Sequence, residues 1–240
     1  MQDRHESSSV HAMGRTPDRR CHRIAQPDDE WFAEVYGGTD WYFGTEPLPQ
    51  LAQHLPRIHR DRRRVPRALD LGCGEGRDSL YLARHDFDVL AMDICREGLE
   101  KLRRVADRES LSISTRQQDV RELRFVPDSY DIVVARTLLD HLDQKWHVGI
   151  AEGIVTTLTS CGMAFVECFT VDDPGYALRD IHASDCARFV RHYFEHGELR
   201  QLFAALEVLE YVEYKKEDAS HGTPHQHGLA VLVGGRSAPL

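Results

Sequence analysis

The sequence has no long hydrophobic run, no excess of positive charge and no paired-cysteine motif. None of its 240 residues belongs to an apolar run of 18 or more, the length that a membrane-spanning helix needs. The formal net charge of −9 gives no support to a general binder of nucleic acid or of an anionic membrane, because phosphate attracts positive charge. The six cysteines form no C-x-x-C pair, so we expect reduced and mostly buried thiols rather than a disulfide framework.

The N-terminal residues also lack the features of a targeting segment. Residues 1–23 have no apolar core, and their acids count against an organelle transit peptide. We therefore expect a cytoplasmic protein without a membrane partner. Residues 1–27 are expected to be a disordered tail and 28–60 a helical lid or cap. Residues 61–240 are expected to form the main domain, with 170–205 as a substrate-side insertion; the oligomeric state is left open.

Short apolar strands alternate with amphipathic helices from residue 68 onward. The pattern predicts strands at 68–71, 87–92, 111–117, 130–135, 163–169, 208–215 and 229–233, and helices at 77–85, 96–108 and 144–160, the last ended by Gly162. The last two strands are joined by a polar loop without a helix, so they must be antiparallel neighbours. We expect a doubly wound, Rossmann-like α/β fold whose seven-stranded, mostly parallel sheet has one antiparallel C-terminal strand and helices on both faces.

A glycine-rich turn, Asp70 to Gly76, follows the first of these strands and opens a helix. In this context glycine lets the turn be tight and lets a ligand approach the backbone closely. Its spacing is G-x-G-x-G, and Arg77 stands where the dinucleotide fingerprint G-x-G-x-x-G would need its third glycine. The acid before the first glycine would repel a pyrophosphate, so an NAD-dependent oxidoreductase is disfavoured.

Three acids follow three successive predicted strands. Asp70, Asp93 and Asp119 would meet at the sheet edge where ligands of such folds bind. Asp93 is placed to accept hydrogen bonds from ribose hydroxyls, and Asp119 from an adenine amino group, with the Val120 N–H reading a ring nitrogen. Each acid taken alone could equally be a strand-end cap or a turn residue.

These features resemble the class I S-adenosylmethionine-dependent methyltransferases from about Arg67 to the C-terminus. Within that superfamily, LDLGCGEGRDSLYLA at 69–83, YFEHGELR at 193–200 and YFGTEP at 42–47 are similar to the tellurite-resistance and thiopurine-methyltransferase-like group.

The resemblance implies S-adenosylmethionine as cofactor and a role for ten residues. Asp70, Gly72, Gly74 and Gly76 would line the methionine moiety, Asp93 the ribose, and Asp119 with Val120 the adenine; Cys73 and Ile94 are counted with them. Arg77 would meet the cofactor carboxylate, or else be an exposed first-turn arginine paired with Asp78 or solvent.

The residues after the predicted fourth strand bear on the methyl acceptor. Ala135 to His141 contains neither the Asn/Asp-Pro-Pro-aromatic motif nor the Pro-Cys motif of superfamily members that act on nucleic acids. With the acidic charge, this predicts a small-molecule acceptor, at sulfur or another heteroatom such as selenium or tellurium, and no nucleic-acid partner. The Arg-rich segment 57–64 is the counter-evidence, and we interpret it as a solvated linker.

Candidate catalytic residues come from segments at the carboxyl edge of the sheet. They are Arg136, His141, Arg191, His192 and His225. His225 belongs to the expected hairpin loop together with His221 and His227. These three histidines leave open a second hypothesis, a metal- or metalloid-binding module, although no metal ligands are assigned. The aromatic segment 31–43 could be a lid over the cleft or could pack into the core.

Overall fold

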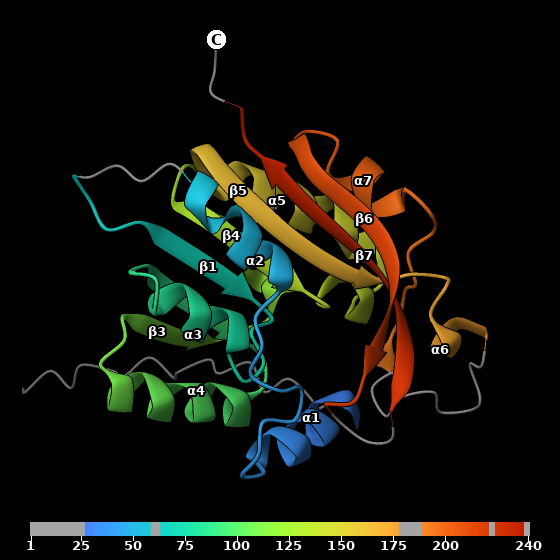
Figure 1. The fold of residues 1–240 in the computed structure, drawn as a ribbon, viewed down its shortest axis with the longest axis horizontal. Helices are drawn as coiled ribbons and strands as arrows, with labels where there is room; N and C mark the ends of the chain where they lie inside the picture. Colours follow the sequence, from blue (N-terminus) through green and yellow to red (C-terminus); the bar gives the residue numbers. More distant parts are fainter. Residues whose placement is uncertain (1–26, 59–62, 178–188, 221–223, 238–240) are drawn as a thin grey trace, which may run out of the picture.

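The computed structural model describes residues 27–58, 63–177, 189–220 and 224–237 (Figure 1). Nearly all of the expected disordered tail, 1–27, lies outside the described residues. The strands are β1 (Arg67–Leu71), β2 (Asp88–Asp93), β3 (Ile113–Gln117), β4 (Tyr130–Arg136), β5 (Leu158–Phe169), β6 (Glu207–Asp218) and β7 (His225–Gly235). The α-helices are α1 (Pro27–Gly37), α2 (Pro49–His54), α3 (Arg77–Ala83), α4 (Arg96–Glu109), α5 (His147–Thr157), α6 (Pro174–Ala177) and α7 (Glu198–Leu202). Short 3₁₀ turns are η1 (Leu55–Arg57), η2 (Val120–Glu122), η3 (Leu139–His141) and η4 (Gln144–Trp146).

The seven strands form one mixed sheet in the order β3-β2-β1-β4-β5-β7-β6. β1 to β5 pair in parallel, whereas β7 runs antiparallel to both β5 and β6. The prediction of a mostly parallel sheet with one reversed strand near its edge is therefore confirmed. The carboxyl ends of β1 to β6 and the start of β7 meet at one edge of the sheet.

Helices cover both faces of the sheet, as the alternation predicts (Figure 1). Successive residues of a strand point to opposite faces. Accordingly, Val133 of β4 packs in a core with Ile154 of α5 and Leu199 of α7, whereas Val134 packs in a second core with Leu82 of α3. The expected burial of the cysteines holds for three of the four that are described, since Cys161 is exposed, and these four are free thiols.

The predicted helix 144–160 is wrong at its C-terminal end. α5 stops at Thr157, and Leu158 begins β5, so Gly162 lies inside a strand instead of ending a helix. Side-chain hydrogen bonds compete here with the backbone bonds of a longer helix. Thr157 Oγ1 donates to the Val126 carbonyl at 2.6 Å, and Thr159 Oγ1 donates to Asp131 at 3.0 Å. These bonds hold the segment against the start of β4, where Leu158 pairs with Tyr130.

The expected hairpin loop between the last two strands is also too long. β6 extends to Asp218 and β7 begins at His225, so His225 and His227 lie in a strand. Lys216 pairs with His227 and Asp218 with His225, so the β6–β7 ladder continues beyond the apolar core. The residues of this extension are polar, and a prediction based on apolar runs therefore ended the strands too early. His221 lies outside the described residues.

Gly98, the third residue of α4, allows a test of how closely α4 packs against the glycine-rich turn. A Cβ atom at Gly98 would lie 2.5 Å from the Gly74 carbonyl oxygen, whereas a Cβ at Gly149, the third residue of α5, would meet nothing within 4 Å. We expect Gly98→Ala to lower the free energy of unfolding by about 1–3 kcal/mol through overpacking. Gly149→Ala should raise it by up to about 1 kcal/mol, as alanine does in open helix positions. Paired thermal melts measure both; stabilisation by both variants would contradict the packing argument.

Candidate functional site

The glycine-rich turn connects β1 to α3 and has a backbone that other residues cannot easily adopt. Gly74 and Gly76 have φ values of +54° and +89°, in the left-handed region. Side chains also close on them: a Cβ at Gly76 would lie 2.5 Å from Leu102, and one at Gly74 would lie 2.9 Å from the Tyr36 hydroxyl. The cavity beside the turn is lined by Gly72 and Gly74, whereas Gly76 packs away from it against Leu102.

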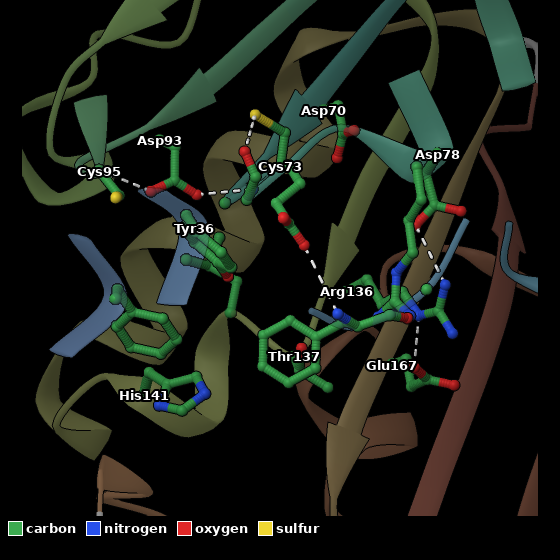
Figure 2. A pocket seen from close by; sticks show the side chains of 18 of the residues that line it. Tyr36, Asp70, Cys73, Asp78, Asp93, Cys95, Arg136, Thr137, His141 and Glu167 are labelled. Atoms are coloured by element: carbon green, nitrogen blue, oxygen red, sulfur yellow. Dashed lines mark hydrogen bonds and ion pairs between the residues drawn. The ribbon is translucent and has the colours of Figure 1, made fainter. Parts of the chain in front are cut away.

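Asp93, at the end of β2, fixes the shape of this turn. Its Oδ2 accepts from Gly74 N–H and its Oδ1 from Cys95 N–H, both at 2.7 Å (Figure 2). Ile94, between them, lines the cavity and is 38% exposed. The carboxylate thus joins the two segments that the sequence assigns to one ligand.

Asp70 is buried at the end of β1, and Ser79 Oγ donates to its Oδ2 at 2.6 Å. Burial, and then the negative charge of Asp78, raise the pKa of the Asp70 carboxyl from 3.8 to about 7. A ligand carrying positive charge near Asp70 would relieve this cost.

Asp119 and Val120 line a second, smaller cavity beyond β2. Asp119 caps η2 by accepting from Arg121 N–H at 2.9 Å, and it forms an ion pair with the Arg121 guanidinium at 2.5 Å. The two cavities share lining residues, among them Gly72, Asp93 and Ile94. The three strand-end acids are therefore brought to one continuous edge, as predicted, although Asp119 has a charged partner that the sequence pattern does not indicate.

The N-terminal segment folds over the larger cavity. Phe32, Tyr36 and Phe43 line it, and Phe32 also lines the smaller one. In Figure 1, α1 lies beside α4, next to the lower end of the β6–β7 hairpin. Both expectations for segment 31–43 have support here: the three rings line the cavity, and Tyr36 is also buried, with 7% of its surface exposed.

A buried ion pair that the sequence analysis missed holds this segment on the glycine-rich turn. Glu75 Oε1 accepts from Lys101 Nζ at 2.6 Å, and its Oε2 accepts from Tyr42 N–H at 2.9 Å. Lys101 Nζ also donates to the Asp40 carbonyl at 2.7 Å. Glu75 lies within the glycine turn, but no periodic signal links it to a lysine 26 residues later in the chain.

Arg77 is half-buried and not paired with Asp78. Its Nη1 donates to the Phe43 carbonyl at 2.8 Å, and its guanidinium lies 5.9 Å from the centre of the Phe43 ring. Asp78 instead accepts from Leu48 N–H at 2.6 Å. The expectation of an exposed arginine is thus wrong, while the residue does line the cavity.

Arg136 lies in the cavity wall between two acids. Its Nε donates to Glu167 at 2.7 Å, and its Nη1 lies 3.5 Å from Asp78 (Figure 2). Burial opposes the charge, but Glu167 and Asp78 outweigh it and hold the pKa of Arg136 above its ordinary value. Two carboxylates already neutralise this arginine, so it is poorly suited to bind a substrate oxyanion.

The remaining catalytic candidates are divided among different surroundings. His141 lines both cavities, and Arg191 lines the smaller one. His192 is among the lining residues of neither, because its Nε2 lies 2.8 Å from Glu198 and its ring packs against His147. His225 contacts His227, and His227, which was not singled out for catalysis, is the one that lines the larger cavity.

The histidines of β7 do not form a metal centre with other described residues. Among the residues that the structure describes, no group of three or more His, Cys, Asp and Glu side chains is arranged to hold a metal ion.

Every helix in the described part of the chain is too short or too polar to cross a membrane.

Part of the chain is similar to known methyltransferases. Residues 68–162 match the family described as "Methyltransferase domain". The probable S-adenosyl-L-methionine-dependent methyltransferase TehB of Haemophilus influenzae is 27% identical over 149 residues, which cover 61% of this chain and 48% of TehB. A ubiquinone biosynthesis O-methyltransferase of Aeromonas salmonicida is 26% identical over 125 residues, 52% of each chain.

Solved structures share the fold. The crystal structure of TehB from Haemophilus influenzae superposes with a TM-score of 0.65 at 21% identity, covering 87% of this chain and 67% of that one. A methyltransferase from Methanosarcina mazei gives 0.64 at 18% identity, covering 81% and 100%.

The match to the methyltransferase-domain family covers less than half of the chain, and the chain shares its fold with solved methyltransferase structures. By sequence it is similar to the tellurite-resistance, TehB-like group. It spans about half the length of the curated TehB sequence that it matches.

Proposed function

We propose that the chain transfers a methyl group from S-adenosylmethionine to a heteroatom of a small molecule. The observation that carries the proposal is the course of the cavity along the strand order. It begins at Gly72 and Asp93, at the ends of β1 and β2, and continues past Arg136 of β4 to Phe169 of β5 and His227 of β7. One cavity thus joins a cofactor end to an acceptor end.

The residues at the cofactor end fit S-adenosylmethionine chemically. Gly72 and Gly74 contribute backbone to the cavity wall, and the buried Asp70 favours a positively charged ligand. We propose that Asp70, Gly72, Cys73, Gly74 and Gly76 hold the methionine moiety and Arg77 its carboxylate. Asp93 and Ile94 would hold the ribose, and Asp119 and Val120 the adenine, with the Arg121 side chain giving way at Asp119.

The bound cofactor would supply a methyl group on a sulfonium. The work left to the chain is to hold the acceptor in line and to exclude water, which together contribute several kcal/mol as effective concentration. We propose residues 28–60 as the lid, since Phe32, Tyr36 and Phe43 line the cavity from that side.

Isothermal titration calorimetry tests the cofactor, and release of S-adenosylhomocysteine tests turnover. We expect S-adenosylmethionine and S-adenosylhomocysteine to bind and NAD not to bind. A screen of thiols, selenite, tellurite, amines and carboxylates would then identify the acceptor. Binding of NAD in place of S-adenosylmethionine would overturn the proposal.

Affinity for S-adenosylmethionine should rise with pH up to about 7. The raised pKa of Asp70, about 7, means that its carboxyl is protonated below that pH in the ligand-free chain. A positively charged ligand favours the ionised carboxylate, so binding releases a proton, and affinity falls by up to about tenfold per unit as the pH decreases below 7. Calorimetry in two buffers of different ionisation enthalpy measures the released proton. Asp70→Asn should remove the pH dependence, and an unchanged slope in this variant would exclude Asp70 as its source.

A further inference from the structure

A buried carboxyl–imidazole pair lies at the acceptor end of the cavity. Asp173, in the loop after β5, has its Oδ2 2.9 Å from Nδ1 of His227 on β7. The two side chains are only 3% and 7% exposed, and His227 lines the cavity. The sequence places His227 in a group with His221 and His225, but no pattern links it to Asp173, 54 positions earlier in the chain.

The surroundings hold this pair in one orientation. Asp173 Oδ1 accepts from Gly175 N–H at 2.7 Å, and Oδ2 also accepts from Gly228 N–H at 3.1 Å. A Cβ at Gly228 would lie 2.3 Å from the Asp173 backbone nitrogen, so the close approach of the loop to β7 requires glycine there. The Phe169 ring packs against His227 with the ring centres 5.0 Å apart.

This geometry determines which ring nitrogen can accept a proton. A carboxylate can only accept, so Nδ1 of a neutral His227 carries the hydrogen and Nε2 presents the lone pair. In the structure Nε2 lies 2.9 Å from His225 Nε2, which must then be the donor. General-base catalysis at this nitrogen requires an acceptor X–H group to replace His225 there.

We propose that His227 is the general base of the methyl transfer and that Asp173 is its positioning residue. The inference rests on the proposed function. The acceptor X–H bond breaks as its proton moves to His227 Nε2, a bond forms between X and the methyl carbon, and the carbon–sulfur bond breaks with its electron pair passing to sulfur. Asp173 stabilises the resulting imidazolium, whose proton returns to solvent when product leaves.

Other charged groups border the base from neighbouring strands. They are His225 on β7 and Lys216 and Asp218 on β6, while Glu167 on β5 lines the same cavity. Lys216 is paired with His227 across the strands, and its Nζ lies 4.0 Å from Asp218 Oδ2. Asp173 supplies the negative charge that compensates the imidazolium formed on proton transfer.

The pair of His227 and Asp173 favours one class of methyl acceptor. A base is useful only where the nucleophile arrives protonated at neutral pH, as a thiol or a phenolic hydroxyl does. Beside these charged groups, Phe169 and Leu229 give that end an apolar wall. We therefore assign to the site a neutral X–H acceptor on a small apolar body, in preference to a preformed anion.

Three acceptors separate this role from a structural one. 4-Nitrothiophenol is ionised at neutral pH, whereas benzyl mercaptan and 4-methylphenol are not, and the last two also distinguish sulfur from oxygen. We expect His227→Gln to lower kcat/KM for the protonated acceptors about 10²- to 10⁴-fold and for 4-nitrothiophenol less than about threefold. Asp173→Asn should show the same selectivity with a smaller loss. His196→Gln, which removes an exposed histidine paired with Glu213, is the matched control. Equal losses on all three acceptors would overturn the proposal.

A spectroscopic measurement does not depend on turnover. Long-range ¹H–¹⁵N spectra of histidine-labelled protein should show His227, assigned by its loss in His227→Gln, as the Nδ1–H tautomer; the Nε2–H tautomer would overturn the proposal. Failure to bind S-adenosylmethionine in calorimetry would count against the proposed function. Binding without turnover of any of the three acceptors by the unaltered chain would overturn the present inference alone.

Discussion

Replacing Lys101 with methionine should lower the free energy of unfolding by about 3–5 kcal/mol, because it leaves the buried Glu75 carboxylate without its cation. The two side chains are 7% and 4% exposed, and the ammonium also bonds to the Asp40 carbonyl. Methionine preserves most of the volume but neither hydrogen bond. We expect a melting temperature lower by about 6–20 °C, faster hydrogen exchange at residues 40–43, and weaker cofactor binding, because Glu75 belongs to the glycine turn.

The same helix provides the control for this experiment. Arg96 and Glu100 of α4 form an exposed ion pair at 2.6 Å, and such pairs contribute little to stability. Arg96→Met should therefore have the same melting temperature as the unaltered protein. The double variant Glu75→Gln/Lys101→Met should recover part of the loss, because it removes the unpaired charge. Equal melting temperatures for Lys101→Met and Arg96→Met would show that the buried pair does not stabilise the packing of segment 40–43.

Replacing Asp93 with alanine should weaken binding of S-adenosylmethionine about 100-fold or more. The change removes the acceptor for Gly74 N–H and Cys95 N–H, and with it the proposed acceptor for the ribose hydroxyls. Hydrogen bonds to a charged group contribute about 1.5–3 kcal/mol each, and about 1.4 kcal/mol corresponds to a factor of ten. Calorimetry with S-adenosylmethionine and S-adenosylhomocysteine measures the loss, which should be similar for both because they share the ribose.

Asp88 begins the same strand and supplies the comparison. It accepts from Ser112 Oγ at 2.9 Å, at the end of β2 opposite to the cavity. Asp88→Ala should bind both ligands as the unaltered chain does. Unchanged affinity in Asp93→Ala would show that Asp93 does not bind the cofactor. It would also contradict the proposal that the three acids at strand ends bind one ligand.

The features that could be predicted from the sequence are those set by local periodicity. The strand–helix alternation, the glycine turn and the acids at strand ends all follow from patterns within about ten residues, and the reversed strand follows from the absence of a helix before it. The end of α5 was mispredicted because the apolar positions through Leu158 continue a helical period. The decisive bonds, from Thr157 to Val126 and from Thr159 to Asp131, join residues far apart in the chain.

The parts of the site that the sequence did not reveal depend on pairings across long separations. Glu75 meets Lys101 and the 40–43 backbone, and Asp173 meets His227, in each case through folding of segments with no shared pattern. The three histidines of the C-terminal segment were visible, but only the strand register shows that His227 borders the cavity.

The position of β7 between β5 and β6 has a consequence for the order of folding. β1, β2 and β3 are consecutive in the chain and can pair through short connections, whereas β5 gains its outer neighbour only when residues 225–235 return to it. Pairings with such separation form late, since the intervening chain must lose its freedom first. The end of the cavity that holds the glycine turn can therefore fold before the end that holds His227. On partial unfolding, the end that holds His227 should unfold first.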